Sequence, residues 1–192
     1  MGYKLKMNRI GITGSLASGK STASKILGKK GPVFSADSIV KKLYSQKKFR
    51  KHISKKIKIQ SSFNIKSLIK QKILSDKFFF KKLEKIIHPL VRKEMINFTE
   101  KHKNKKFIFF EIPLLVESRL MKNFDIIFYI KAKKSLRLKR FKKKGGNKIF
   151  FNVLNKKQFS DRKKAKYCDH VIVNEKNLNI FKKKIIRYTK KI

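Results

Sequence analysis

The chemistry of this sequence is concentrated in one run near its N-terminus, with the pattern G-x-x-x-x-G-K-S. The glycines let the backbone curl so that successive N–H groups point inward at phosphate oxygens. The lysine can bridge the β- and γ-phosphates of a nucleoside triphosphate, and the serine after it can ligate Mg²⁺. The run is Gly14, Ser15, Leu16, Ala17, Ser18, Gly19, Lys20 and Ser21, followed by Thr22. We predict that residues 14–22 bind ATP, with Lys20 catalytic and Ser21 a ligand of Mg²⁺.

The sequence on either side of this loop supplies the context that the pattern needs. Residues 9–13 read as a strand that leads into the loop, and residues 22–27 continue as a helix. A helix that begins at the loop directs the positive end of its dipole toward a bound phosphate. The loop alone indicates a nucleotide but not a reaction, because GTPases, ATPases and small-molecule kinases share it.

A carboxylate that could serve an acceptor follows the second expected strand. Asp37 lies just past the carboxyl end of that strand, which in a doubly wound sheet lies beside the loop. It could accept a hydrogen bond from the acceptor hydroxyl and orient its oxygen for in-line attack. It could also cap the helix that begins near Ser38, and the two roles are compatible. Because the chain has only eleven acidic residues, we predict that Asp37 is catalytic and binds the substrate.

Five short apolar segments read as strands. They lack polar alternation, as expected for strands that are buried on both faces of a parallel sheet. The segments are Ile10–Thr13, Pro32–Ser35, Phe107–Glu111, Ile126–Ile130 and His170–Val173. Helical patterns lie between most of them. We therefore predict an α/β fold of the P-loop NTPase type, a five-stranded parallel sheet flanked by helices.

Three further helices are expected from apolar residues at helical spacing. Asp76 is placed to cap the first, and Pro89 suits the first turn of the second. The third lies at the C-terminus. Their apolar faces are Phe79, Leu83 and Ile86 in the first, Val91, Met95 and Phe98 in the second, and Leu178, Phe181, Ile185 and Tyr188 in the third.

Two segments interrupt the simple alternation of strands and helices. Residues 36–106, more than seventy in number, are far more than a plain crossover needs. We therefore expect a helical substrate-binding insertion at about residues 44–103 within a single kinase domain of residues 1–192. The polar stretch at about residues 142–161 contains Gly145-Gly146 and is a candidate lid, although an ordinary surface loop fits its composition nearly as well.

The net charge of +43 is extreme and calls for a comparison with nucleic-acid-binding proteins. Only eight of the 54 basic side chains are arginine, the residue whose planar fork reads phosphates and guanine edges. The lysines are also scattered along the whole chain instead of forming one basic arm. This composition resembles that of proteins encoded by an AT-rich genome more than that of a nucleic-acid-binding protein, so we expect no specific nucleic-acid partner.

Nothing in the sequence indicates a membrane or an export route. No apolar run approaches the ~20 residues that span a bilayer, and the N-terminal residues lack the apolar stretch of a secretory signal. The single cysteine cannot form an internal disulfide, which agrees with a reducing compartment. We expect a cytoplasmic monomer.

Over nearly its full length the sequence resembles the dephospho-coenzyme A kinase family. A Pro-Leu-Leu-x-Glu element and a His-Pro element after such a loop are close to diagnostic of that family. The supporting stretches are residues 13–22, Ala36-Asp37, Leu83-Glu84, Ile87-His88-Pro89, residues 112–117 and residues 169–174, with Arg140, Gln158 and Lys164 at the family's spacing.

The resemblance implies transfer of the ATP γ-phosphoryl group to the ribose 3′-hydroxyl of dephospho-CoA. Asp37 would orient that hydroxyl or act as its base, and His88 and Arg92 would lie on the substrate side of the cleft. Glu117 would lie near the acceptor, and Arg140 would reach the phosphates or the base of the nucleotide. The helical insertion corresponds to the family's CoA-binding subdomain. Without the resemblance, His88 could simply cap a helix and Glu117 could be a surface acid.

The sequence also departs from the family at several positions. Ser35 replaces the first acid of the family's Asp-Ala-Asp element, and Lys66 and Lys144 replace arginines. These changes bear on affinity more than on the type of reaction, because lysine cannot make a bidentate fork. Glu111 ends the third strand, where it could hold a water on Mg²⁺ or have no role.

Two other functions compete with this interpretation. The chain could be another small-molecule kinase of the same superfamily, acting on a nucleoside or a nucleotide. It could also be a basic nucleic-acid-binding protein with a relic phosphate-binding loop.

Overall fold

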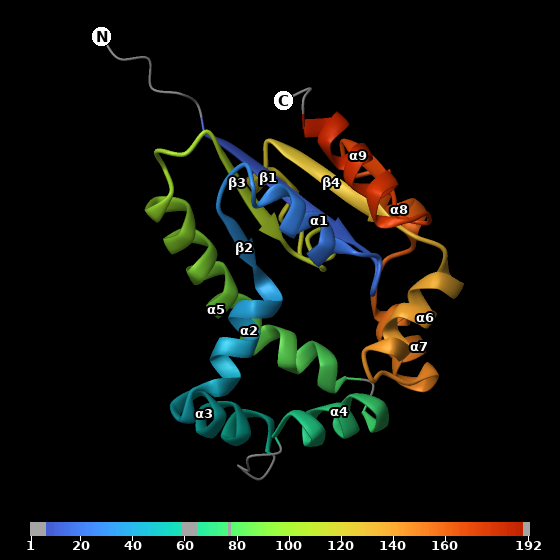
Figure 1. The fold of residues 1–192 in the computed structure, drawn as a ribbon. Coiled ribbons are helices and arrows are strands. Elements are labelled where there is room, and N and C mark those ends of the chain that lie inside the picture. The colour runs from blue at the N-terminus through green and yellow to red at the C-terminus, as the bar shows by residue number, and fades with distance from the viewer. Residues whose placement is uncertain (1–6, 59–64, 77, 190–192) are drawn as a thin grey trace. The chain divides into compact units, whose positions relative to one another are not determined.

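The computed structural model describes residues 7–58, 65–76 and 78–189, and the chain divides into two compact units. One unit comprises Met1–Ser35 and His102–Ile192, and the other comprises Ala36–Lys101. Figure 1 shows the helices and strands of both units.

The first unit is built on a sheet of five parallel strands in the order β2-β3-β1-β4-β5. The strands are β1 (Asn8–Gly14), β2 (Val33–Ser35), β3 (Phe107–Glu111), β4 (Ile126–Lys131) and β5 (His170–Val173). The five predicted strands are thereby confirmed. Because β1 lies between β3 and β4, the loop that follows it emerges at the centre of the carboxyl edge of the sheet, where ligands bind in this class of fold.

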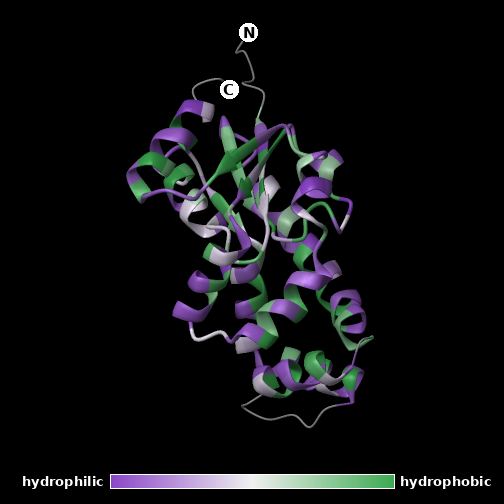
Figure 2. Ribbon diagram, turned by 90° about the vertical axis from the view of Figure 1, so that its right-hand side faces the viewer, coloured by the Kyte–Doolittle hydropathy of each residue, from purple (hydrophilic) through white to green (hydrophobic). Residues whose placement is uncertain are grey.

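Helices of the same unit accompany the sheet. They are α1 (Lys20–Leu27), η1 (Met121–Asn123), α6 (Lys134–Lys143), α7 (Lys148–Lys157), α8 (Asp161–Ala165) and α9 (Leu178–Thr189). The core cluster joins strands β1, β3, β4 and β5 to Ala23 and Leu27 of α1 and to Phe181 and Ile185 of α9. The strands are accordingly hydrophobic in Figure 2. The predicted C-terminal helix is confirmed, but Leu178 is 61% exposed and does not line the core.

All regular elements described between Ala36 and Lys101 are helices. They are α2 (Ala36–Ser45), α3 (Lys47–Ile57), α4 (Ile65–Ser75) and α5 (Phe79–Lys101). Each of the last three buries apolar side chains at intervals of about one turn, such as Phe49, Ile53 and Ile57 in α3. This compact unit starts earlier than the insertion expected at about residues 44–103, because α2 follows β2 without a loop.

Helix α5 corrects the prediction of two helices in this part of the chain. It runs for 23 residues with Pro89 inside it, so Pro89 does not begin a second helix. Pro89 is exposed, and its missing N–H costs one helical hydrogen bond, which burial of Phe79, Leu83 and Ile87 on the opposite face outweighs. The predicted cap is confirmed, since Asp76 Oδ1 accepts hydrogen bonds from the N–H groups of Phe78 (2.8 Å) and Phe79 (3.0 Å).

The candidate lid at residues 142–161 is more regular than its sequence indicates, because it contains helix α7. Asn147 begins this helix by accepting a hydrogen bond from the N–H of Phe150 at 2.8 Å. Gly145 supplies the positive φ of +81° that the turn before it requires. Asparagine as a helix cap was the signal for α7 that the sequence analysis missed.

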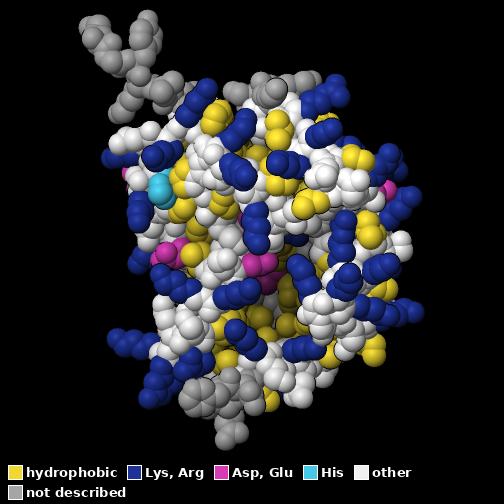
Figure 3. All heavy atoms as spheres, in the orientation of Figure 1, with side chains coloured by type: hydrophobic (Ala, Val, Ile, Leu, Met, Phe, Trp, Pro, Cys, Tyr) yellow, Lys and Arg dark blue, Asp and Glu magenta, His cyan; other side chains and the backbone are white. Residues whose placement is uncertain are grey.

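The surface reflects the composition of the chain. Lys and Arg side chains are spread over the face drawn in Figure 3 and do not gather in one patch. In the part of the chain that the structure describes, no helix combines the length and the apolar character needed to cross a bilayer.

The continuity of α5 leads to a prediction about stability. Pro89→Ala restores a backbone donor in the helix interior, and we expect the free energy of unfolding to rise by about 1–3 kcal/mol. Urea denaturation followed by circular dichroism measures the change. Lys93→Ala, at another exposed position of α5, is the control and should stay within about 0.5 kcal/mol of the parent protein. A loss of stability in Pro89→Ala would show that the fold requires the proline.

Candidate nucleotide-binding site

The loop between β1 and α1 has the backbone conformation of a phosphate cradle. Ala17 and Gly19 both have positive φ, +59° and +106°, which turns neighbouring N–H groups toward the same side. A Cβ atom on Gly19 would overlap the side-chain amide of Asn174, so any other residue there would have to displace that amide and adopt a strained φ. The cradle opens at the N-terminus of α1, where the helix dipole is positive.

Lys20 is held against the cradle by the carbonyl groups of the loop. Its Nζ donates hydrogen bonds to the carbonyl oxygens of Gly14 and Ser15, both at 3.1 Å, and the side chain is only 8% exposed. The Ser15 carbonyl also accepts the N–H of Ser18 at 3.1 Å. A fixed positive charge therefore lies within the loop, as the binding of a triphosphate requires.

Glu111, whose role the sequence left open, is bonded to the predicted metal ligand. Ser21 Oγ donates a hydrogen bond to Glu111 Oε1 at 2.6 Å, and Glu111 is buried at the carboxyl end of β3. A hydroxyl and a carboxylate are the oxygen ligands that Mg²⁺ prefers, so this pair fits the ion. Among the described residues no group of three or more His, Cys, Asp or Glu side chains could hold a metal ion.

Arg140 and Asn174 support the second half of the loop. Arg140 donates from Nη1 to the Ser18 carbonyl at 3.2 Å and from Nη2 to the Asn174 carbonyl at 3.0 Å. The Asn174 amide donates to the same Ser18 carbonyl at 2.8 Å. Burial lowers the pKa of Arg140, and the negative charge of Glu175 partly offsets this effect. The structure thus brings Arg140 to the cradle, together with Asn174 from the end of β5.

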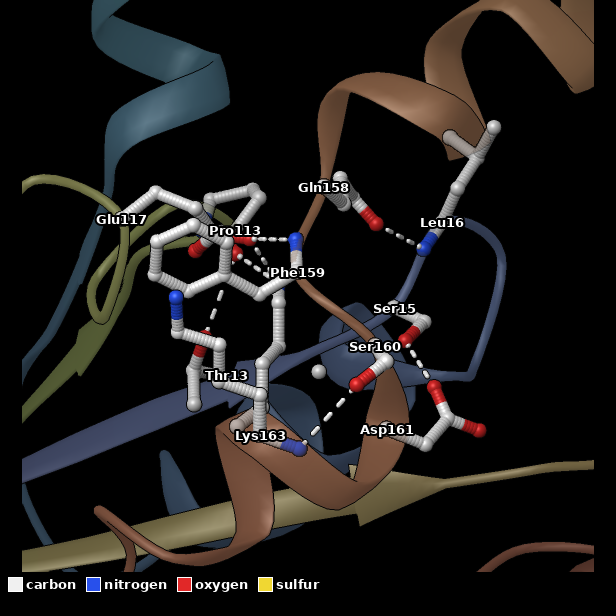
Figure 4. A network of polar contacts seen from close by, with 12 residues as sticks. Thr13, Ser15, Leu16, Pro113, Glu117, Gln158, Phe159, Ser160, Asp161 and Lys163 are labelled. Carbon is white, nitrogen blue, oxygen red and sulfur yellow. Dashed lines mark hydrogen bonds and ion pairs between the residues drawn. The ribbon is translucent and has the colours of Figure 1, made fainter.

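A second set of contacts reaches the first half of the loop from residues 158–161, which follow α7 and begin α8 (Figure 4). Gln158 Oε1 accepts the N–H of Leu16 at 2.8 Å, and Asp161 Oδ1 accepts the hydroxyl of Ser15 at 2.5 Å. The Tyr129 hydroxyl lies 3.1 Å from the same Ser15 oxygen. Neither Tyr129 nor Asp161 was identified from the sequence.

Arg137 is a further residue that the sequence analysis missed. Arg137 is 4% exposed, and its guanidinium donates to the carbonyl oxygens of Ala132 (3.1 Å) and Leu16 (3.4 Å) and to Asn155 Oδ1 (2.7 Å). The ring of Phe151 lies 5.8 Å from the guanidinium carbon. The scarcity of arginine in such a lysine-rich chain was the available signal for Arg137.

Glu117 lies in a buried ion pair. Its Oε1 accepts Lys164 Nζ at 2.9 Å and the N–H of Phe159 at 2.9 Å, and Lys164 also donates to the Pro113 carbonyl at 3.0 Å. Lys164 is fully buried; this burial lowers its pKa, and the charge of Glu117 opposes the shift. Glu117 Oε2 is buried and has no hydrogen-bond partner among the described residues.

Three predicted site residues belong to the helical unit. Asp37 is exposed in the first turn of α2, two residues after the end of β2, so it lies inside the helix and does not precede it as a cap. His88 and Arg92 lie one turn apart on α5. Burial lowers the pKa of His88, with a smaller contribution from the charge of Arg92, and Glu84 lies 3.9 Å from His88.

The family model and the relatives found by sequence point to the same family. A family model described as dephospho-CoA kinase matches residues 8–179. The dephospho-CoA kinase of Bartonella quintana is 36% identical over 179 residues, which cover 90% of this chain and 91% of the relative. A dephospho-CoA kinase structure from Campylobacter jejuni has a TM-score of 0.64 at 26% identity, with 96% of each chain covered. The structure of TT1252 from Thermus thermophilus has a TM-score of 0.80 at 22% identity, with 97% of each chain covered, and supports the fold alone.

The contact between Gly19 and Asn174 leads to a prediction about the cradle. Gly19→Ala places a methyl group on the Asn174 amide and should abolish ATP binding, measured by titration calorimetry. Gly145→Ala is a matched control, because Gly145 also has positive φ but no atom lies within 4 Å of the position that a Cβ would take. We expect Gly145→Ala to lose about 1–2 kcal/mol of stability and to keep its affinity for ATP. Normal ATP binding by Gly19→Ala would contradict the described loop geometry.

Proposed function

The chain belongs to the dephospho-CoA kinase family, and we propose that it transfers the γ-phosphoryl group of ATP from the cradle at residues 14–22 to an acceptor oriented by Asp37. The reaction is the ATP-dependent phosphorylation of the ribose 3′-hydroxyl of dephospho-CoA. It yields CoA and ADP in the last step of CoA biosynthesis. The comparisons lend no support to a nucleoside kinase or to a nucleic-acid-binding protein.

The observation that carries the proposal is the buried ammonium of Lys20 at the N-terminus of α1. Phosphoryl transfer needs little covalent chemistry from the protein, and its rate depends on positioning and on neutralisation of charge on the transferred group. Lys20 supplies a cation that is fixed before ATP arrives, so little reorganisation is needed during the reaction. The N–H groups of residues 14–22 complete the binding of the triphosphate.

Ser21 and Glu111 are the proposed ligands of Mg²⁺, Ser21 directly and Glu111 either directly or through a water. When bound there, the ion would neutralise part of the negative charge of the phosphate groups. Support comes from the 2.6 Å hydrogen bond between the two side chains. Arg140 is proposed to reach the phosphates or the base of the nucleotide, since its guanidinium contacts the Ser18 carbonyl of the loop.

The acceptor is proposed to bind through the helical unit, with Asp37, His88 and Arg92 on the substrate side. Asp37 lies two residues after the end of β2, whose last residue Ser35 pairs in register with Glu111, and it is exposed. A carboxylate there can accept the hydrogen bond of the 3′-hydroxyl and aim its oxygen at the γ-phosphorus. Glu117 remains a proposed acceptor-side residue, and the structure holds it in the buried pair with Lys164.

We also propose a role for the lid segment, for two lysines and for the state of the enzyme in the cell. Residues 142–161 would act as a lid that excludes water during transfer, with α7 as its rigid part. Lys144 in that segment and Lys66 in α4 would contribute charge without the bidentate geometry of arginine. We expect a cytoplasmic monomer, in keeping with the single, free cysteine.

Lys20→Ala tests the cation of the cradle. We expect turnover of dephospho-CoA with ATP and Mg²⁺, measured by coupled release of ADP, to fall at least about 10²-fold while the circular dichroism spectrum is retained. Lys25→Ala is the control, because Lys25 lies on the same helix but is exposed. Comparable rates for the two variants would refute the assignment of Lys20.

Asp37→Asn tests the orientation of the acceptor. The amide keeps the size of the side chain but lowers its basicity, so kcat should fall about 10²- to 10⁴-fold with little change in the Kd of ATP. Glu100→Gln, an exposed acid of α5, controls for the loss of one negative charge. If Asp37→Asn keeps a kcat near that of the parent enzyme, another group orients the hydroxyl.

A further inference from the structure

An acidic side chain lies directly against the phosphate cradle, where a negative charge would ordinarily oppose the binding of a triphosphate. Asp161 Oδ1 accepts the hydroxyl of Ser15 at 2.5 Å, although the two residues are 146 positions apart in the chain. Ser15 is 3% exposed and is the second residue of the loop. The chain has only eleven acids, so this placement requires a physical reason.

Ser15 connects Asp161 to the catalytic lysine. On one side, its hydroxyl is shared between Asp161 and the hydroxyl of Tyr129. On the other side, its carbonyl oxygen accepts both Lys20 Nζ and the N–H of Ser18. Since one residue carries both sets of contacts, the hydrogen bonds that hold the Ser15 side chain also restrain the backbone whose carbonyl accepts Lys20.

Asp161 is itself held in place and its charge is balanced. It begins helix α8, where the hydroxyl of Ser160 caps the helix by accepting the N–H of Lys163 at 3.2 Å. The guanidinium of Arg137 lies 4.0 Å from Asp161 Oδ1. Burial tends to raise the pKa of Asp161, but hydrogen bonds from Ser15 and Tyr129 and the charges of Arg137 and Lys131 together lower it. The carboxylate is therefore ionised at neutral pH and paired with a cation.

A second hydrogen bond, to Gln158, holds Leu16, the residue of the loop that follows Ser15. Gln158, directly after the end of α7, accepts the N–H of Leu16 at 2.8 Å. Residues 158 and 161 thus fix a side-chain hydroxyl and a backbone N–H that are adjacent in the loop (Figure 4). Two independent contacts restrict the loop more than either one alone.

We infer that Asp161 is a positioning residue for phosphoryl transfer, which acts through the Ser15 hydroxyl to fix the carbonyl that holds Lys20. The inference rests on the proposed function, in which Lys20 contacts the transferred phosphate. Asp161 itself touches no reacting atom. A misplacement of about 1 Å at a reacting centre can cost about 10²-fold in rate, so a loosened Ser15 should lower kcat.

The test compares Asp161→Ala, Asp161→Asn, Ser15→Ala and the double variant with both alanines. Asp161→Ala should lower kcat about 10- to 100-fold and raise the KM of ATP less. Because Asp161 acts through Ser15, the double variant should be no slower than the slower single variant. Asp161→Asn keeps an oxygen acceptor for Ser15 and should recover most of the lost kcat.

Asp125→Ala is the matched control. Asp125 also accepts a hydrogen bond from a residue distant in the sequence, the backbone N–H of Arg9 at 2.7 Å. This contact lies at the opposite end of β1 from the cradle. Its loss should lower the melting temperature and leave kcat unchanged. Three outcomes would each overturn the inference. Asp161→Ala could have the same kcat as this control, or its loss of kcat could add to that of Ser15→Ala in the double variant. Asp161→Asn could also lose as much kcat as Asp161→Ala.

A separate readout distinguishes this inference from the proposed function. If the parent enzyme does not phosphorylate dephospho-CoA, the proposed function fails. The same set of variants is then measured for the Kd of ATP by titration calorimetry. Non-additive losses of affinity in the Ser15 and Asp161 variants would still support positioning of the cradle, and additive losses would oppose it. If Asp161→Ala does not fold, Asp161→Asn and Ser15→Ala carry the comparison.

Discussion

The hydrogen bonds from Lys20 to the carbonyl oxygens of Gly14 and Ser15 are the interaction on which the rest of the site depends. An ammonium that is largely removed from water must keep acceptors around it, because burial of an unpaired charge is costly. The loop provides those acceptors only if its backbone keeps the positive φ angles at Ala17 and Gly19. The conformation of the loop and the position of the cation therefore depend on each other.

The surroundings of the loop stabilise both of its halves by side chains from distant parts of the chain. Arg140 and Asn174 share the Ser18 carbonyl, whereas Gln158 and Asp161 bind Leu16 and Ser15. The segment with Gln158 and Asp161 is in turn anchored by the buried pair of Lys164 and Glu117. Because α7 ends just before Gln158, a movement of the proposed lid would be transmitted to the cradle.

Because the chain is strongly basic, the positions of its few acidic side chains are informative. With 54 basic and eleven acidic side chains, most cations on the surface have no acid to pair with. Three of the acids are nevertheless placed at the carboxyl edge of the sheet or on the segments that support the loop: Glu111 on Ser21, Asp161 on Ser15 and Glu117 on Lys164. Burial strengthens each of these interactions relative to a surface pair, since less water screens it.

Local patterns in the sequence were sufficient for the phosphate-binding loop, the five strands and the family, because each depends on residues that are close together in the chain. The prediction that Pro89 begins a new helix was wrong, because the packing of a whole face of α5 outweighs one missing hydrogen bond. The roles of Asp161 and Arg137 and the partner of Glu111 were decided only by the tertiary structure. Ser21 and Glu111 are 90 positions apart, and Ser15 and Asp161 are 146 apart. Such pairs form because parallel strands bring their carboxyl ends to one edge, and no local periodicity records which side chains meet there.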